Sequence, residues 1–210
     1  AEHITFIADN ETQVIDAKSC PYFSLYEVNI RQKNVLGDGL LIKSAWYTNI
    51  DKTIIYGVDS SQGTGVVTGT DIAGGIWSIK SSSVDNWQDC IDWQNGSFYN
   101  MVLRDTSLQN SSRYGFYGSG GRIEQLAFDN CYFESTGGCV SAIRGESDVI
   151  RRLSLEQPYI LAGDSSGNSY YSSPIINLVN CDSIDVDMAY VGKIATTFCN
   201  IDDINNLGKV

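Results

Sequence analysis

Apolar residues recur along the chain in triplets spaced +2 and then +5, and this repeat constrains the fold more than any other feature. An early copy stands at Phe23, Leu25 and Ile30, and five later copies start 24, 25, 27 and 31 residues apart. The later copies are Trp77, Ile79, Val84; Met101, Leu103, Leu108; Leu126, Phe128, Phe133; Leu153, Leu155, Ile160; and Ile184, Val186, Val191. Such a period is typical of solenoid proteins.

The spacing within each triplet indicates short strands joined by bends. A +2 step places two side chains on one face of a strand, whereas a +5 step requires a bend and a second strand. A further apolar column precedes the triplets at Phe98, Ile123 and Ile150, with Cys181 in the equivalent place before the last copy. Single coils cannot bury such faces, but coils stacked about 4.8 Å apart can.

We therefore predict an all-β fold, a right-handed single-stranded parallel β-helix of about seven or eight rungs. Val, Ile, Thr, Ser, Tyr and Gly fill the repeating segments, and these residues favour strands and turns over helices. A β-sandwich is the competing architecture, since it also has short strands and frequent turns. The constant register over five successive copies favours the β-helix.

The repeat also suggests how the chain is organised. Residues 1–22 follow it poorly, and we expect an N-terminal cap or lead-in there, followed by the β-helix domain over 23–210. The polar stretches 162–173 and 59–75 are interpreted as loops, the first projecting from the solenoid. We expect the chain to be one module of a longer protein.

Charge and cysteine usage exclude several functions. The formal net charge is -11, which disfavours nucleic-acid binding and attraction to an anionic membrane. No apolar run approaches the roughly 20 residues of a membrane helix, so no membrane insertion is expected. The six cysteines form no CxxC pair and His3 is the single histidine, so we expect neither a zinc site nor another cofactor. The cysteines are interpreted as reduced core thiols, consistent with folding in a reducing cytosol.

Irregular rungs, abundant Ser, Asn, Gly and Tyr, acidic charge and free cysteines together resemble bacteriophage tailspikes. Pectate-lyase-like β-helix enzymes share this architecture. The resemblance spans nearly the whole chain and rests on architecture, without a diagnostic motif. It implies a homotrimer on a virion tail, outside the cell, that binds and often cleaves polysaccharide of the host cell surface.

Stacked rungs convert sequence columns into neighbours, and one outward column carries charge. It contains Lys80, Arg104, Asp129, Glu156 and Asp187, each three residues after the start of a triplet. Asp129 and Glu156 would lie about 5 Å apart, which suits the two carboxylates of a retaining glycoside hydrolase, with Asp187 as an alternative and Arg104 as a substrate-binding residue. The plainer interpretation is a solvated column of weak surface ion pairs.

Two further groups are candidates for sugar binding. Asp89 and Asp92 lie between Trp87 and Trp93, and indoles beside carboxylates resemble a sugar subsite; the alternative is that the indoles belong to the core or to a trimer contact. Tyr170 and Tyr171, in the 162–173 stretch, suit recognition because tyrosine is amphipathic and loses little entropy on ordering. The alternative is an ordinary loop that packs down on the solenoid.

The remaining motifs provide little evidence for a function. Gly163, Asp164 and Ser165 copy the GDS opening of one esterase class, but no later histidine exists to complete a triad. A polysaccharide lyase would need a base and a cation; Arg104, Arg151 and Arg152 are the nearby basic residues, and no calcium-loop signature is present. Three functions stay open: a glycan depolymerase, a carbohydrate-binding module without cleavage, and a structural spike segment.

Overall fold

The computed structural model describes residues 4–9, 12–17, 20–42, 45–59, 61–68, 75–94, 96–135, 139–146, 149–162, 168–187, 190–192 and 197–202. Within these ranges every regular element is a β-strand, and the strands pair in parallel. The chain forms a parallel β-solenoid of about 7 turns with three sheets, which confirms the fold class predicted from the repeat.

Each turn contributes one strand to each of three sheets, which we number in the order in which the chain enters them. The first sheet contains β1 (Ile4–Ala8), β4 (Val28–Gln32), β7 (Ile54–Tyr56), β10 (Ser83–Asp85), β14 (Ser107–Gln109), β18 (Tyr132–Glu134), β21 (Tyr159–Leu161) and β24 (Tyr190–Gly192). The second contains β2 (Gln13–Ala17), β5 (Asp38–Ile42), β8 (Thr64–Thr68), β11 (Asp89–Trp93), β15 (Tyr114–Gly118), β19 (Ser141–Gly145), β22 (Ile176–Val179) and β25 (Cys199–Asp202). The third contains β3 (Tyr22–Tyr26), β6 (Tyr47–Asp51), β9 (Ile76–Lys80), β13 (Asn100–Arg104), β17 (Leu126–Asp129), β20 (Arg152–Glu156) and β23 (Ser183–Asp187).

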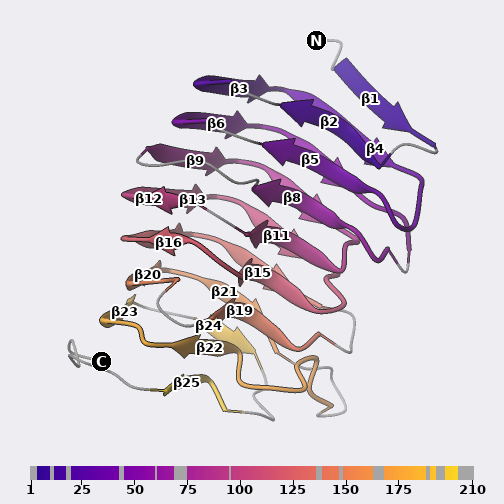
Figure 1. The fold of residues 1–210 in the computed structure, drawn as a ribbon. Coiled ribbons are helices and arrows are strands. Elements are labelled where there is room, and N and C mark those ends of the chain that lie inside the picture. Colours follow the sequence, from indigo (N-terminus) through magenta and orange to yellow (C-terminus); the bar gives the residue numbers. More distant parts are fainter. Residues whose placement is uncertain are drawn as a thin grey trace.

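A short two-stranded sheet, β12 (Ser97–Phe98) with β16 (Arg122–Ile123), lies at the bend before the third sheet. Figure 1 shows the turns stacked along one axis, with β1 and β25 at opposite ends of the stack. Residues about 25 positions apart in sequence are therefore neighbours in space.

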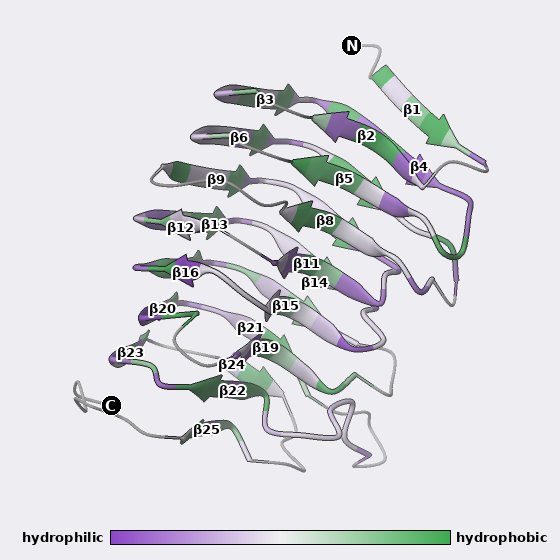
Figure 2. Ribbon diagram, in the orientation of Figure 1, coloured by the Kyte–Doolittle hydropathy of each residue, from purple (hydrophilic) through white to green (hydrophobic). Residues whose placement is uncertain are grey.

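The apolar columns of the repeat form the interior. Leu103 pairs in register with Phe128, and Phe128 with Leu155, and all three side chains are buried. The Phe128 ring also contacts Phe133 edge to face, with ring centroids 5.2 Å apart. Figure 2 shows strands such as β5 and β8 as largely hydrophobic, whereas hydrophilic residues gather at many of the bends. Burial of this continuous apolar column is the main stabilising contribution to the fold.

The +5 step of the repeat corresponds to a tight corner between the third and first sheets. One residue at each corner has φ between 47° and 52°, the left-handed region; the corner residues are Glu27, Lys52, Ser81, Asp105, Asn130 and Gln157. At four of these corners the next residue is small and buried and donates a hydrogen bond to the carbonyl two positions earlier, as Thr106 does to Arg104 at 2.9 Å. A single left-handed residue therefore suffices to turn the chain from one sheet to the next.

Cys131 occupies the same corner position as Thr106, and its thiol lies 3.5 Å from the Asp129 carbonyl oxygen. Cys90, Cys139 and Cys181 are likewise buried, and all six cysteines are free thiols. Cys20 and Cys199 are partly exposed. The interpretation as core thiols is thus confirmed for four of the six cysteines.

Two segments differ from the sequence interpretation. Strands β1 and β2 lie within residues 1–22 and pair in register with β4 and β5, so the sheets begin before residue 23. The stretch 59–75 includes β8, whose five residues are all buried, so the loop interpretation is wrong there; residues 60 and 69–74 lie outside the described part. All three strands lack the +2, +5 triplet, which is why the repeat did not find them.

Candidate functional site

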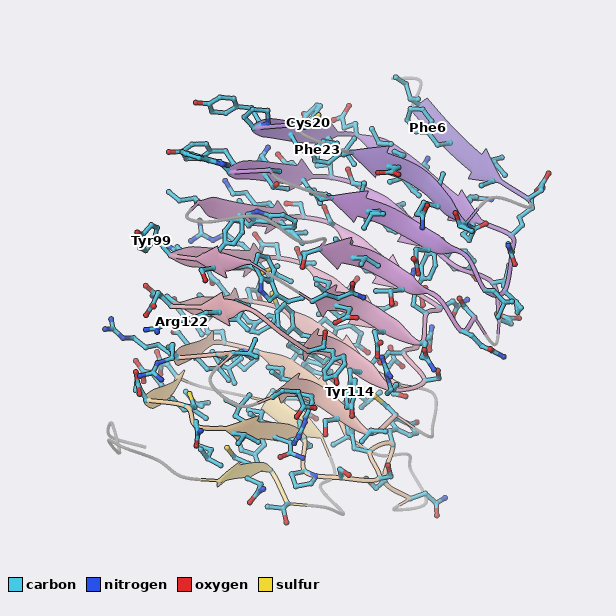
Figure 3. The ribbon with its side chains drawn as sticks, viewed as in Figure 1. Phe6, Cys20, Phe23, Tyr99, Tyr114 and Arg122 are labelled. Atoms are coloured by element: carbon cyan, nitrogen blue, oxygen red, sulfur yellow. The ribbon has the colours of Figure 1, made fainter. Side chains whose placement is uncertain are left out.

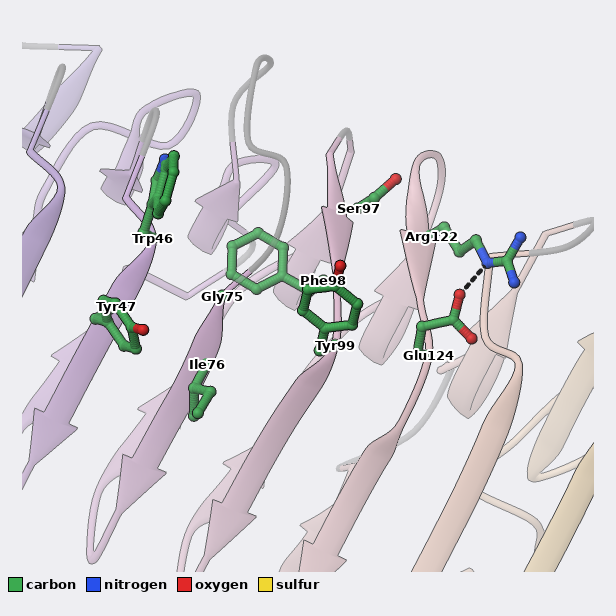
Figure 4. A pocket seen from close by; sticks show the side chains of 9 residues that line it. All are labelled: Trp46, Tyr47, Gly75, Ile76, Ser97, Phe98, Tyr99, Arg122 and Glu124. Carbon is green, nitrogen blue, oxygen red and sulfur yellow. Dashed lines mark ion pairs between the residues drawn. The ribbon is translucent and has the colours of Figure 1, made fainter.

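A groove on the outer face of the third sheet is the most developed concave surface that we find. Its larger part is a cavity of about 760 Å³, a size suited to a sugar or another small ligand. It is lined by Trp46, Tyr47, Gly75, Ile76, Ser97, Phe98, Tyr99, Arg122 and Glu124 (Figure 4). The lining comes from the bends that lead into β6, β9, β13 and β17.

Exposed aromatic rings form the walls of this groove. Trp46 and Tyr99 are 56% and 71% exposed, so both rings are open to solvent. They stand on bends two turns apart, with Gly75 and Ile76 between them (Figure 4). Rings held in this way can stack on the apolar faces of a ligand without first emerging from the core.

Gly75 keeps the floor of the groove low. The carbonyl oxygen of Trp46 accepts a hydrogen bond from the Ile76 amide at 3.0 Å, which draws the two backbones together. A Cβ atom at position 75 would overlap that carbonyl oxygen and the ring of Phe98. Glycine is therefore required here by the close approach of two adjacent turns.

The groove continues toward the N-terminal end of the solenoid. A second cavity, of about 370 Å³, shares Tyr47 and Ile76 with the first and extends to Tyr22. Tyr22, Tyr47 and Ile76 are in register on β3, β6 and β9, and the two tyrosine rings stack with centroids 5.3 Å apart. The groove thus runs along the solenoid axis across several turns.

Short side chains form the floor beside these rings. Ser24, Asn49 and Ser78 are in register and line the second cavity. The same column continues through Val102, Ala127, Ser154 and Asp185 along the third sheet. Small residues leave the face low enough for an extended polymer, and the serine and asparagine groups can hydrogen-bond to its hydroxyls.

One ion pair closes the far wall of the groove. Arg122 Nε lies 2.5 Å from Glu124 Oε1, and both side chains are partly exposed. Ile123, between them, is buried, so Arg122 and Glu124 project from the same side of the backbone (Figure 4). Figure 3 shows Arg122 and Tyr99 on the same flank of the solenoid. They are the charged members of the residues that line the two cavities.

The charged column predicted from the sequence lies on the outer face of this same sheet, where its strands end, whereas the groove lies where they begin. Lys80, Arg104, Asp129, Glu156 and Asp187 are successive partners in register. Adjacent members are therefore separated by one strand spacing, about 4.8 Å between backbones. The structure thus places the Asp129 and Glu156 carboxylates on neighbouring strands of one face, as the repeat predicts.

Asp129 is not a free carboxylate, because Arg104 Nε donates to its Oδ2 at 2.5 Å. Glu156 and Asp187 are exposed, and no ion pair involves either of them within the described residues. The column therefore offers one neutralised acid beside two acids that face solvent.

The tryptophans of the second predicted site are buried. Trp87 and Trp93 are 1% and 0% exposed, so neither indole can stack on a sugar, and the expectation of an exposed indole is wrong. Trp93 instead packs edge to face against Phe98, with ring centroids 4.6 Å apart, and so supports the groove from the interior. An aromatic residue at an inward-facing strand position is part of the core whatever its neighbours in sequence.

The acids beside these tryptophans are held within the second sheet. Asp89 is fully buried and receives two hydrogen bonds from Arg113. Burial raises the pKa of Asp89, and the Arg113 guanidinium opposes this shift. Asp92 accepts hydrogen bonds from Ser119 at 2.6 Å and Gln94 at 2.9 Å. This arrangement stabilises the sheet and does not present the acids to a polymer.

The predicted tyrosines of the 162–173 stretch also pack inward. Tyr171 is buried in the core, and burial raises the pKa of its hydroxyl; Tyr170 is partly buried against the same core. Residues 163–167 lie outside the described part. Neither ring joins the groove.

A second group of aromatic rings lies on the outer face of the first sheet. Tyr132, Tyr159 and Tyr190 are in register, and their ring centroids are 5.1 and 4.6 Å apart. We call this group the tyrosine ladder. Each of its residues follows an acid of the charged column by three positions.

Sequence reasoning missed Trp46, Tyr47 and Tyr99, the rings that form the groove. The sequence contained one signal for the tyrosines: Tyr22 and Tyr47 directly precede the inward-facing residues Phe23 and Thr48. Because successive side chains of a strand point to opposite faces, both tyrosines should face outward. Trp46 and Tyr99 lie outside the strands, where the repeat makes no prediction.

Comparison with known proteins does not assign the chain to a family. No protein-family model matches the chain, and neither a curated protein nor a solved structure matches it. In the described residues, no helix is long and apolar enough to cross a membrane. No group of three or more His, Cys, Asp and Glu side chains in that part of the chain is arranged to hold a metal ion.

Proposed function

We propose that the chain is a polysaccharide-binding β-solenoid module, which holds a glycan chain along the outer face of its third sheet. The observation that carries this proposal is the groove lined by Trp46, Tyr47 and Tyr99, which runs parallel to the solenoid axis over a floor of small polar residues. Aromatic rings stack on the C–H faces of sugars, and hydroxyl and amide groups bind their hydroxyls. A groove that crosses several turns suits a polymer better than a single small molecule.

As in the tailspikes that the chain resembles, the ligand would be polysaccharide of a host cell surface, and the module would form part of a homotrimeric fibre on a virion tail. A trimer predicts a sedimentation mass about three times that of one chain. A monomer at micromolar concentration would contradict the trimer without affecting the groove.

The binding proposal is tested by affinity electrophoresis in gels that contain capsular or O-chain polysaccharides from a panel of bacteria. The wild-type chain should be retarded by at least one polymer. Trp46→Ala and Tyr99→Ala should each weaken that retention about 30-fold, the effect of removing an aromatic anchor from a binding site. Tyr190→Ala, an exposed ring of the tyrosine ladder, is the matched control and should behave as the wild type. Retention that survives both groove substitutions would overturn the proposal.

A second candidate function, glycan hydrolysis, is favoured by the position of Asp129 and Glu156 on neighbouring strands of the same face. Paired carboxylates about 5–5.5 Å apart serve as nucleophile and acid/base in retaining glycosidases. The groove lies where the strands of the third sheet begin and these acids lie where the strands end, so a polymer that crosses the sheet obliquely would reach both.

Hydrolysis would produce new reducing ends, without the absorbance of the unsaturated uronates that a lyase releases. Asp129→Asn and Glu156→Gln should each abolish the new reducing ends and leave retention in the gel unchanged. Undiminished cleavage by both variants would exclude these acids. Retention without cleavage by the wild type would leave binding as the function.

A further inference from the structure

The charge of the groove points to the class of glycan that it accepts. The whole chain carries a formal net charge of -11, which repels acidic polymers at a distance. An acidic protein can still bind an acidic sugar when an unpaired cation stands in its site. The decisive question is therefore whether Arg122, the cation of the groove, is available to a ligand.

Arg122 is neutralised by Glu124, and the local backbone fixes this pairing. The Arg122 amide donates to the Gly96 carbonyl at 2.7 Å, and the Glu124 amide donates to the Phe98 carbonyl at 2.9 Å. The buried Ile123 anchors the segment between them. Arg122 Nε and Glu124 Oε1 then meet at 2.5 Å on the wall of the groove. The groove presents this pair as a neutral unit.

Among the other basic side chains of this face, Arg152 at the start of β20 is exposed and lines neither cavity, and the rest are compensated or lie where the strands end. Arg104 pairs with Asp129 at 2.5 Å, and Lys52 Nζ lies 3.4 Å from Glu27 Oε1. Lys80 is the last residue of β9, at the end of the strand away from the groove, and is in register with Asp51. The second cavity is lined by aromatic, apolar and uncharged polar residues.

We infer that the groove accepts an uncharged stretch of polysaccharide, and that Glu124 sets this preference by occupying Arg122. This inference rests on the proposed function, because it concerns the ligand of the same groove. Glu124 is a specificity residue: it engages Nε of the guanidinium, offsets its positive charge, and places a carboxylate near any acidic sugar that enters.

The test uses matched polymers that differ only in charge. The polysaccharide that retards the wild-type chain is oxidised at its primary alcohols to carboxylates, and retention is compared before and after oxidation. Oxidation should weaken wild-type binding at least five-fold. Glu124→Gln, which keeps the size of the side chain and frees Arg122, should recover about five-fold for the oxidised polymer at low salt, the scale of a partly exposed ion pair. The quantity compared is the ratio of retention by the oxidised polymer to retention by the native polymer, which Glu124→Gln should raise.

Arg122→Gln provides the opposite control, since it leaves Glu124 unpaired and should weaken binding of the oxidised polymer further. An acidic natural ligand, or an oxidised polymer that Glu124→Gln binds no better than the wild type, would overturn the inference. If retention of that acidic ligand still depends on Trp46, only the charge preference fails. Retention independent of Trp46, or no retention by any polymer, removes the proposed function as well.

Discussion

The groove and the tyrosine ladder are both built from aromatic rings stacked in register, yet only the groove is concave. In the ladder, Tyr132, Tyr159 and Tyr190 occupy one strand position of three successive turns and fill the space between one another. In the groove, Tyr22 and Tyr47 stack in the same way, but Trp46 and Tyr99 come from bends outside the strand register.

This difference shows how a solenoid makes a binding surface. Stacking alone gives a flat ladder whose rings are partners for each other. Concavity arises where a bend raises rings on either side of a low point, here Gly75. We therefore expect the groove to contribute mainly to binding and the ladder mainly to stability, and three predictions test this division.

The largest expected effect is on glycan binding. Tyr47→Ala removes a ring shared by both cavities of the groove and should weaken retention by the polysaccharide about 30-fold. Tyr159→Ala removes the central ring of the ladder and should leave retention unchanged. Affinity electrophoresis of the two variants side by side measures both, after circular dichroism shows that each is folded. Equal losses would erase the distinction between the two surfaces.

A smaller and opposite effect is expected on stability. Tyr159 contacts a ring on each side, whereas Tyr47 stacks on Tyr22 alone. Aromatic pairs contribute about 0.5–1.5 kcal/mol each beyond burial. Tyr159→Ala should therefore lower the free energy of unfolding by about 1 kcal/mol more than Tyr47→Ala, as measured by urea titration. The reverse order would show that the ladder is not a stabilising element.

The smallest effect concerns alkaline pH. Burial raises the pKa of Tyr132 above its ordinary range, and the hydrogen bond that its hydroxyl donates to Glu134 at 2.7 Å raises it further. A folded pKa above the unfolded value of about 10 gives a contribution that is complete below pH 10 and is lost as the pH rises beyond it. The melting temperature should therefore fall less steeply above pH 10 in Tyr132→Phe than in the wild type. Parallel falls would remove Tyr132 from the alkaline response.

The periodic part of the molecule was predictable in detail. The triplets placed Leu103, Phe128 and Leu155 in one inward stack, and the position directly after each of them gave the charged column from Lys80 to Asp187 in the correct order. Such predictions succeed because strand pairing repeats one register through many turns, so a single correct alignment fixes all the neighbours. They left open whether Trp87 and Trp93 face a sugar or belong to the core, and the structure confirms the core alternative.

The sequence by itself determined the parallel solenoid, its stacked interior and the order of its outward columns, because the +2, +5 spacing of apolar residues permits burial only when coils lie on one another. Only the tertiary structure decided which aromatic rings face solvent and where they enclose space. Trp46, Gly75 and Tyr99 lie in bends without a repeat, and their positions follow from contacts between turns, such as the Trp46 carbonyl against the Ile76 amide, that no periodic pattern encodes.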